Sequence, residues 1–159
     1  MIPAPHIRYS ARAVVLHDGH VLLIRSRRPA GDHFILPGGG QEPGETLTQA
    51  VRREVLEETC VPIEVGPMLW IREYLGDWYG RPEDPGKHRV EVVFTAAPTG
   101  DPAHARLGAD IGPTYVSVEW VELRAAGHLS TVPPLLASRL AQLADEPRPA
   151  AVYLGATTD

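Results

Sequence analysis

The stretch that decides the fold runs from residue 38 to residue 61 and reads GGGQEPGETLTQAVRREVLEETCV. Its second part predicts a helix over 47–59, because Leu47, Val51 and Val55 recur at i, i+4 and i+8 and would form one apolar stripe. Its first part is rich in glycine and contains a proline, which excludes a helix interior. The stretch therefore indicates a glycine-rich loop that leads into the N-terminal end of an amphipathic helix.

The ends of this helix also carry local signals. Thr46 fits the N-cap position, and Gln49 fits the reciprocal position of a capping box. Pro62 ends the helix and favours an extended conformation at Val61. These signals agree with the apolar periodicity and fix the predicted helix at both ends.

Three glutamates lie on one surface of the predicted helix. At 100° per residue, Glu54, Glu57 and Glu58 fall within an arc of about 100°, beside the apolar stripe rather than opposite it. One interpretation is a solvated acidic face, with Arg53 paired to Glu57 at i, i+4. The other is a site for a hard divalent cation such as Mg²⁺ or Mn²⁺, which prefers oxygen ligands.

The glycine-rich loop before the helix favours the second interpretation. Glycines let backbone N–H groups approach a bound anion closely, and they let the chain turn sharply. On its own a glycine-rich turn is a weak signal. Next to a helix that carries carboxylates, it indicates a site that holds a cation and a phosphate together.

The rest of the chain predicts a sheet with few helices. An apolar strand at 11–17 is followed by Asp18-Gly19, a strong hairpin signal. We predict further strands at 20–25, 33–36, 64–74, 88–97 and 115–121, and a second helix at 134–143. Two long segments, 76–87 and 98–113, are typical of lids or binding loops. Hairpin strands with few helices predict an α+β fold in which helices pack on the sheet.

The stretch resembles the box of the Nudix hydrolase family, G-x5-E-x7-R-E-U-x-E-E-x-G-U, in which U is a bulky aliphatic residue. The residues in register are Gly39, Glu45, Arg53, Glu54, Val55, Glu57, Glu58 and Val61. The resemblance implies the α/β/α sandwich of that family, with a mixed β-sheet between helices. We expect one Nudix hydrolase domain over residues 1–159, with the box at 39–61.

The resemblance also implies roles for single residues. Glu54, Glu57 and Glu58 would bind Mg²⁺ or Mn²⁺, together with the backbone at Gly39. Arg53 would hold a glutamate in position by ion pairing, and Glu45 would lie nearby or bind through water. Among the catalytic residues are therefore Arg53, Glu57 and Glu58.

One position departs from the box, since Cys60 stands where the family has glycine. A glycine there would suit a left-handed helix C-cap, and a residue with a Cβ pays about 1 kcal/mol or more for that conformation. Either Cys60 adopts the left-handed conformation, or the helix ends differently with the help of Pro62.

Two places are favoured for the general base. The first is Glu57 or Glu58 in the box, and the second is Glu91, on the predicted strand at 88–97. Glu91 lies on the strand face opposite Val90, Val92 and Phe94. The alternative for Glu91 is a structural role as the cross-strand partner of an arginine.

Two groups of residues are candidates for substrate binding. Arg25, Arg27 and Arg28 cluster at the end of the second strand, where guanidinium groups could hold a distal phosphate or simply be solvated. Trp78 and Tyr79, in the segment 76–87, could stack on a nucleobase.

Composition narrows the setting in which this chemistry takes place. The 159 residues include 15 Lys+Arg and 20 Asp+Glu, a net charge of −5 that argues against a generally basic nucleic-acid-binding protein. The single cysteine excludes an internal disulfide, and no apolar run has transmembrane length. We expect a cytoplasmic protein that binds neither nucleic acid nor membrane and acts on a small nucleotide, with a homodimer as one arrangement found among relatives.

The function that these expectations support is hydrolysis, with a divalent metal, of a diphosphate linkage in a nucleoside diphosphate derivative. ADP-ribose, a nucleotide sugar and a dinucleoside polyphosphate all fit this pattern. Two alternatives stay open at this point: a house-cleaning pyrophosphatase for nucleoside triphosphates, and a non-catalytic Nudix-like module that senses a nucleotide.

Overall fold

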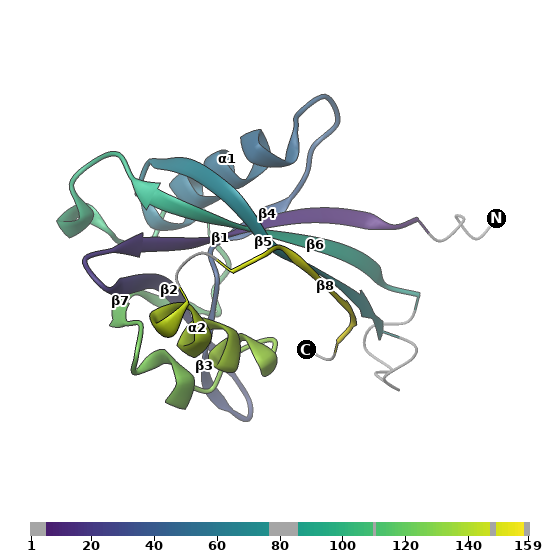
Figure 1. Cartoon of the computed structure of the whole chain (residues 1–159). Coiled ribbons are helices and arrows are strands. Elements are labelled where there is room, and N and C mark those ends of the chain that lie inside the picture. Colours follow the sequence, from purple (N-terminus) through teal and green to yellow (C-terminus); the bar gives the residue numbers. More distant parts are fainter. Residues whose placement is uncertain (1–5, 77–85, 110, 147–148, 158–159) are drawn as a thin grey trace.

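The computed structural model of the chain describes residues 6–76, 86–109, 111–146 and 149–157. Figure 1 shows the helices and strands of these residues. In chain order they are β1 (Arg8–His17), β2 (His20–Arg28), β3 (Gly31–Ile35), β4 (Gly38–Gly40), α1 (Leu47–Thr59), β5 (Ile63–Leu75), β6 (His88–Pro98), the 3-10 helix η2 (Pro102–His104), β7 (Tyr115–Glu122), the 3-10 helix η3 (Ala126–His128), α2 (Leu135–Asp145) and β8 (Val152–Ala156).

The strands form one mixed sheet. Its main path runs in the order β3-β2-β1-β6-β5-β8, with β4 paired to β1 and β7 paired to β2. β1 and β6 pair in parallel, as do β5 and β8, whereas the other pairs are antiparallel. Between β1 and β2, Asp18 and Gly19 both have positive φ (44° and 74°), as a tight type I′ hairpin turn requires.

The two helices cover opposite faces of this sheet (Figure 1). Alternation along β1 explains the arrangement, because successive side chains of a strand point to opposite faces. Ala13 and Val15 are fully buried in the cluster that includes Val51 and Val55 of α1. Val14 is fully buried in the cluster that includes residues of α2. The α/β/α sandwich predicted from the sequence is confirmed.

Two strands were not expected from the sequence. β4 is a three-residue strand of glycines that lies very close to β1, and a Cβ at Gly38 would overlap the carbonyl oxygen of Ala11. β8 is a five-residue strand at the edge of the sheet, with none of its residues buried. In addition, β2 extends through Arg28, so Arg27 and Arg28 belong to the strand itself.

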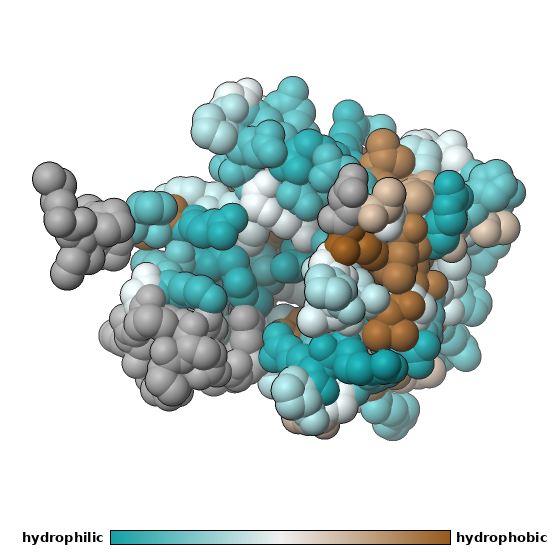
Figure 2. All heavy atoms as spheres, turned by 180° about the vertical axis from the view of Figure 1, so that it is seen from behind, coloured by the Kyte–Doolittle hydropathy of each residue, from teal (hydrophilic) through white to brown (hydrophobic). Residues whose placement is uncertain are grey.

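Seen from behind, the surface of the molecule is uneven in character (Figure 2). Hydrophobic residues gather on the right of this view, and hydrophilic residues cover much of the remainder of this face. None of the helices among the described residues combines the length and the apolar character that crossing a membrane requires.

Candidate active site

The N-terminal end of α1 has the predicted capping box. The backbone N–H of Gln49 donates to Thr46 Oγ1 at 3.2 Å, and the N–H of Thr46 donates to Gln49 Oε1 at 2.7 Å. Ala50, Val51 and Val55 are fully buried against the sheet. This anchoring turns the glutamates at the other end of the helix toward an open cavity.

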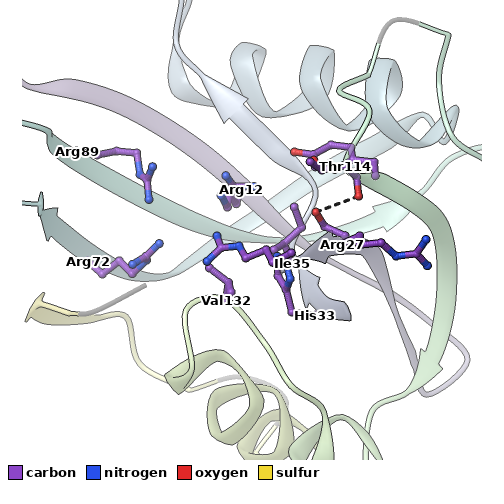
Figure 3. Close-up of a pocket in the computed structure, with 11 residues that line it drawn as sticks. Arg12, Arg27, His33, Ile35, Arg72, Arg89, Thr114 and Val132 are labelled. Atoms are coloured by element: carbon purple, nitrogen blue, oxygen red, sulfur yellow. Dashed lines mark hydrogen bonds between the residues drawn. The ribbon is translucent and has the colours of Figure 1, made fainter. Parts of the chain in front are cut away.

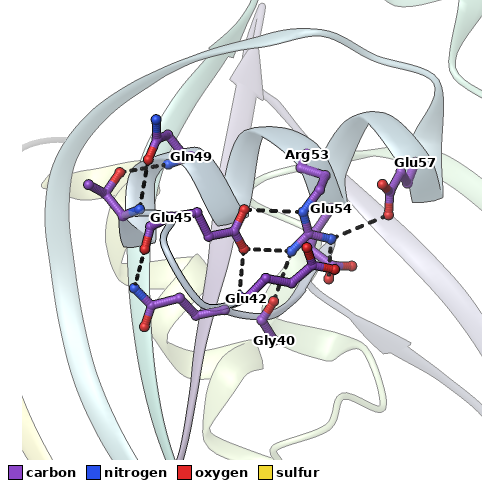
Figure 4. A network of polar contacts seen from close by, with 9 residues as sticks. Gly40, Glu42, Glu45, Gln49, Arg53, Glu54 and Glu57 are labelled. Atoms are coloured by element: carbon purple, nitrogen blue, oxygen red, sulfur yellow. Dashed lines mark hydrogen bonds and ion pairs between the residues drawn. The ribbon is translucent and has the colours of Figure 1, made fainter.

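Arg53 is the centre of a polar network that joins the glycine-rich segment to the helix (Figure 4). Its guanidinium group donates to both carboxylate oxygens of Glu45, at 2.7 and 3.2 Å, and to the carbonyl oxygen of Gly40 at 3.0 Å. It also lies 2.9 Å from Glu54 Oε1 and 3.5 Å from Glu57 Oε2. A planar fork with five donors suits this arrangement, and a lysine could not reproduce it.

The network also stabilises the charged form of Glu45. The hydrogen bond from Arg53, together with that from the backbone N–H of Glu42, lowers the pKa of Glu45. Gly39 lies against Glu54, and a Cβ at this position would overlap the carboxylate. Arg53 and Gly39 together fix where the carboxylate of Glu54 lies.

Glu58 is the most buried of the three box glutamates, with 8% of its surface exposed. It accepts a hydrogen bond from the backbone N–H of Gly38 at 2.8 Å and another from the hydroxyl of Tyr115 at 3.4 Å. Burial raises the pKa of Glu58 to about 7, even though the N–H of Gly38 and the charge of Arg12 act in the opposite direction. Tyr115 was not expected as a site residue.

All three glutamates line one open cavity of about 690 Å³, which we call the acid cavity. The opposite wall comes from the segment between β6 and β7 and from the start of β7, with Ala109, Ile111, Gly112, Thr114 and Tyr115. The sequence predicted a lid or binding loop in this region. The described part of the segment forms a wall of the cavity.

This wall is attached to the end of α1. The backbone N–H of Gly108 donates to the carbonyl oxygen of Glu58 at 3.0 Å, and that of Arg106 donates to Thr59 at 3.0 Å. A Cβ at Gly108 would overlap the carbonyl oxygen of Glu57, so only glycine allows this approach. The sequence gives no signal that pairs Gly108 with the helix.

The donors in the acid cavity fit a hard divalent cation in their chemistry. Glu54, Glu57 and Glu58 supply carboxylate oxygens, the ligand type that Mg²⁺ and Mn²⁺ prefer. The three carboxylates do not converge on one point. Among the described residues, no three side chains of Asp, Glu, His or Cys lie close enough together to hold an ion. In this conformation Arg53 supplies the positive charge next to Glu54 and Glu57.

Cys60 adopts the left-handed conformation, the first of the two alternatives. It is the C-cap of α1, with φ 57° and ψ 16°, and its N–H donates to the carbonyl oxygen of Leu56 at 2.9 Å. Helix α1 therefore keeps the C-terminal geometry that a glycine would give, and Glu58 remains within the helix.

Glu91 takes the cross-strand arrangement with an arginine. It is directly opposite Arg72 in the β5–β6 register, and Arg72 Nε donates to Oε1 at 2.7 Å while Arg12 Nε donates to Oε2 at 2.7 Å. Burial would raise the pKa of Glu91, but the charges of Arg12 and Arg72 outweigh it and lower the pKa to about 2. With only 2% of its surface exposed, Glu91 is poorly suited to accept a proton from a substrate water.

The three arginines expected at the substrate site do not stay together. Arg25 lies 3.0 Å from Glu119 and donates to Ser117, and it does not line either cavity. Arg27 and Arg28 both line a second cavity beside the first, and Arg27 pairs with Asp32 at 3.0 Å. The candidate stacking residues Trp78 and Tyr79 lie outside the described residues.

Comparisons with known proteins identify the class to which this fold and site belong. Residues 7–143 match the model of the NUDIX domain, so the chain belongs to the Nudix family. A solved NUDIX hydrolase from Nitrosomonas europaea has a TM-score of 0.69 at 19% identity, covering 93% of this chain and 78% of that one. At 19% identity, this structural similarity shows the fold alone.

Two curated relatives have specific names. The 8-oxo-dGDP phosphatase of Homo sapiens is 35% identical over 105 residues, which are 62% of this chain and 29% of that protein. The ADP-ribose pyrophosphatase of Methanocaldococcus jannaschii is 34% identical over 90 residues, which are 56% of this chain and 50% of that protein. The chain thus matches half or less of the length of each of these relatives.

Proposed function

We propose that this protein hydrolyses a diphosphate linkage in a nucleoside diphosphate derivative, with Mg²⁺ or Mn²⁺ as cofactor. One observation carries the proposal: in a chain of the Nudix family, Glu54, Glu57 and Glu58 line a single open cavity beside the glycine-rich segment. Solvent access and several carboxylates are what a phosphate-bound cation needs.

The residues that would hold the cation are Glu54, Glu57 and Glu58, with the backbone of Gly39 next to them. When bound, the cation offsets negative charge on the diphosphate oxygens. The side chain of Glu57 is 59% exposed and paired to Arg53 only at 3.5 Å, so it can turn toward a ligand at little cost. Arg53 holds Glu54 and Glu45 in position from the other side.

In the proposed reaction, a water oxygen forms a bond to one phosphorus, and the bond from that phosphorus to the bridging oxygen breaks. A glutamate accepts the proton of the water, which general-base catalysis requires. Glu57 or Glu58 takes this role, because both border the acid cavity and the buried Glu91 is held by Arg12 and Arg72. The products are two phosphate monoesters when both sides of the linkage are esterified.

The names of the relatives support a nucleoside diphosphate derivative as the substrate class. One relative is named an ADP-ribose pyrophosphatase and another an 8-oxo-dGDP phosphatase. Both names describe phosphorus anhydrides of a nucleoside. We therefore propose ADP-ribose, nucleotide sugars and dinucleoside polyphosphates as the first compounds to test, with nucleoside triphosphates beside them.

The test is a substrate panel with products identified by mass spectrometry, in Mg²⁺, in Mn²⁺ and in excess EDTA. We expect cleavage between two phosphorus atoms that EDTA abolishes. Glu57→Gln and Glu58→Gln should each lower the rate by about 10² to 10⁴, because each removes the general base or a carboxylate that would hold the cation. Glu64→Gln is the matched control, because the exposed Glu64 pairs with Arg52 outside the cavity and should leave the rate unchanged.

Two outcomes would contradict the proposal. A Glu57→Gln protein and a Glu58→Gln protein that both keep the full Mg²⁺-dependent rate would remove the box glutamates from the reaction. Binding of a nucleotide without turnover of any compound in the panel would instead favour the nucleotide-sensing module.

A further inference from the structure

A second cavity lies beside the acid cavity, and its charge is of the opposite sign. It has a volume of about 250 Å³, and five arginines from four strands line it. No aspartate or glutamate is among the described residues of its lining. We call it the arginine pocket, and the arginines that line it are Arg12, Arg27, Arg28, Arg72 and Arg89 (Figure 3).

Three of these arginines surround a single carboxylate, that of Glu91. Glu91 accepts hydrogen bonds from Arg12 and Arg72 and lies 3.9 Å from Nε of Arg89. The guanidinium group of Arg89 also lies over the ring of Tyr74, 5.1 Å from its centroid. Glu91 itself supplies one negative charge to three guanidinium groups. These contacts hold the three guanidinium groups in position around Glu91.

The remaining two arginines differ from each other. Figure 3 shows the guanidinium group of Arg27 pointing away from those of Arg12, Arg72 and Arg89. This group pairs with Asp32 at 3.0 Å. Arg28 is exposed and makes no ion pair with any residue that the structure describes. Arg28 is thus the member of the pocket that can engage a ligand without first leaving a carboxylate.

The arginine pocket and the acid cavity are adjacent. Thr114 and Tyr115 line both, and the Tyr115 hydroxyl donates to Glu58. Arg12 donates to the carbonyl oxygen of Gly38, whose N–H donates to Glu58. A ligand that extends past Tyr115 therefore meets carboxylates at one end and guanidinium groups at the other.

We propose that the arginine pocket binds a phosphate group that the substrate carries outside the diphosphate linkage to be cleaved. This inference rests on the proposed function for the identity of the substrate. Guanidinium forks match phosphate oxygens in bidentate fashion, and several held in advance lose little freedom on binding. The pocket is smaller than the 300–1,000 Å³ typical of whole small-molecule sites, which fits one charged group rather than a second nucleoside.

The first experiment measures binding without metal and without turnover. Inorganic phosphate is titrated into the protein in EDTA, and the imidazole resonances of His33, which lines the pocket, are followed by NMR. His33→Gln assigns them. We expect a saturable shift, weakened about tenfold or more in Arg28→Gln. Arg124→Gln is the control, because Arg124 is exposed, pairs with Asp145 and lines neither cavity.

This titration tests phosphate binding in the arginine pocket alone. An unchanged His33 resonance, or equal affinities in Arg28→Gln and Arg124→Gln, would overturn the proposal. Because no metal and no cleavage are involved, a failed hydrolase assay leaves a positive titration standing.

The second experiment compares substrates that differ by one phosphate: ADP-ribose with 2′-phospho-ADP-ribose, and dephospho-coenzyme A with coenzyme A. We expect kcat/KM for the phosphorylated member of at least one pair to be about tenfold higher. Arg28→Gln should reduce that preference below about threefold, mainly through KM, as expected for a group that binds without entering the chemistry. Equal kcat/KM within both pairs would refute this substrate assignment.

Discussion

Replacement of Glu91 by glutamine is predicted to destabilise the protein substantially. The carboxylate is buried between Arg12 and Arg72, with both contacts at 2.7 Å. Its pKa falls from 4.5 to about 2 on folding, and a shift of this size corresponds to about 3 kcal/mol of stability at pH 7. Removal of one partner of a buried ion pair typically costs about 3–5 kcal/mol, which agrees with the value from the pKa shift.

The pH dependence of this contribution has a definite sign. Because the pKa is lower in the folded protein, the stabilisation is complete above pH 4.5 and is lost as the pH falls toward 2. At pH 3 about 1 kcal/mol of it should remain. The difference in unfolding free energy between wild type and Glu91→Gln should therefore shrink from about 3 to about 1 kcal/mol between pH 7 and pH 3.

The assay is urea unfolding followed by tryptophan fluorescence, since Trp70 is buried. Glu64→Gln, which removes the exposed partner of Arg52, should cost less than about 1 kcal/mol at either pH. A loss below 1 kcal/mol for Glu91→Gln, or an equal pH dependence of the two proteins, would refute the assignment of Glu91 as a buried anchor for arginines.

Three further predictions concern the box. Gly39→Ala should lower the hydrolysis rate about tenfold or more while the protein stays folded by circular dichroism, because the new methyl group displaces the carboxylate of Glu54; an unchanged rate would show that Glu54 does not need this position. Arg53→Lys should also lower the rate about tenfold, since lysine keeps the charge but loses the two-pronged contact with Glu45; steady-state kinetics beside the circular-dichroism spectrum would show whether charge alone is enough. Cys60→Gly should leave stability unchanged or raise it by up to about 1 kcal/mol, whereas Cys60→Val should lower it by about 1–2 kcal/mol, because φ is 57°; thermal unfolding in the reverse order would contradict the cost of the left-handed cap.

The elements with strong local signals could be predicted from the sequence. Helix α1 was expected at 47–59, and it spans these residues with the expected capping box. Apolar periodicity and capping depend on neighbours within four residues, so no tertiary information was needed. The box placed Glu54, Glu57 and Glu58 on one helix surface, and all three line one cavity.

The parts that depend on contacts between distant segments could not be predicted. The arginine pocket joins Arg12 of β1 to Arg72 of β5 and Arg89 of β6, which lie up to 77 residues apart in the sequence. Only the strand order brings them together. Of the cluster suggested by sequence proximity, Arg27 and Arg28 line the pocket and Arg25 does not, and Arg27 is paired with Asp32. Strand β8 is short and exposed, so no buried apolar pattern marked it.

The attachment of the segment before β7 to the end of α1 has a consequence for variation among related chains. Gly108 fixes this attachment through main-chain atoms alone, so the spacing across the acid cavity does not depend on the side chains at positions 109 and 111. Those two positions can change in size or polarity while the glutamates opposite keep their places. Under the proposed function, exchange of these two side chains would alter the contacts with the group next to the diphosphate while Glu54, Glu57 and Glu58 stay in place.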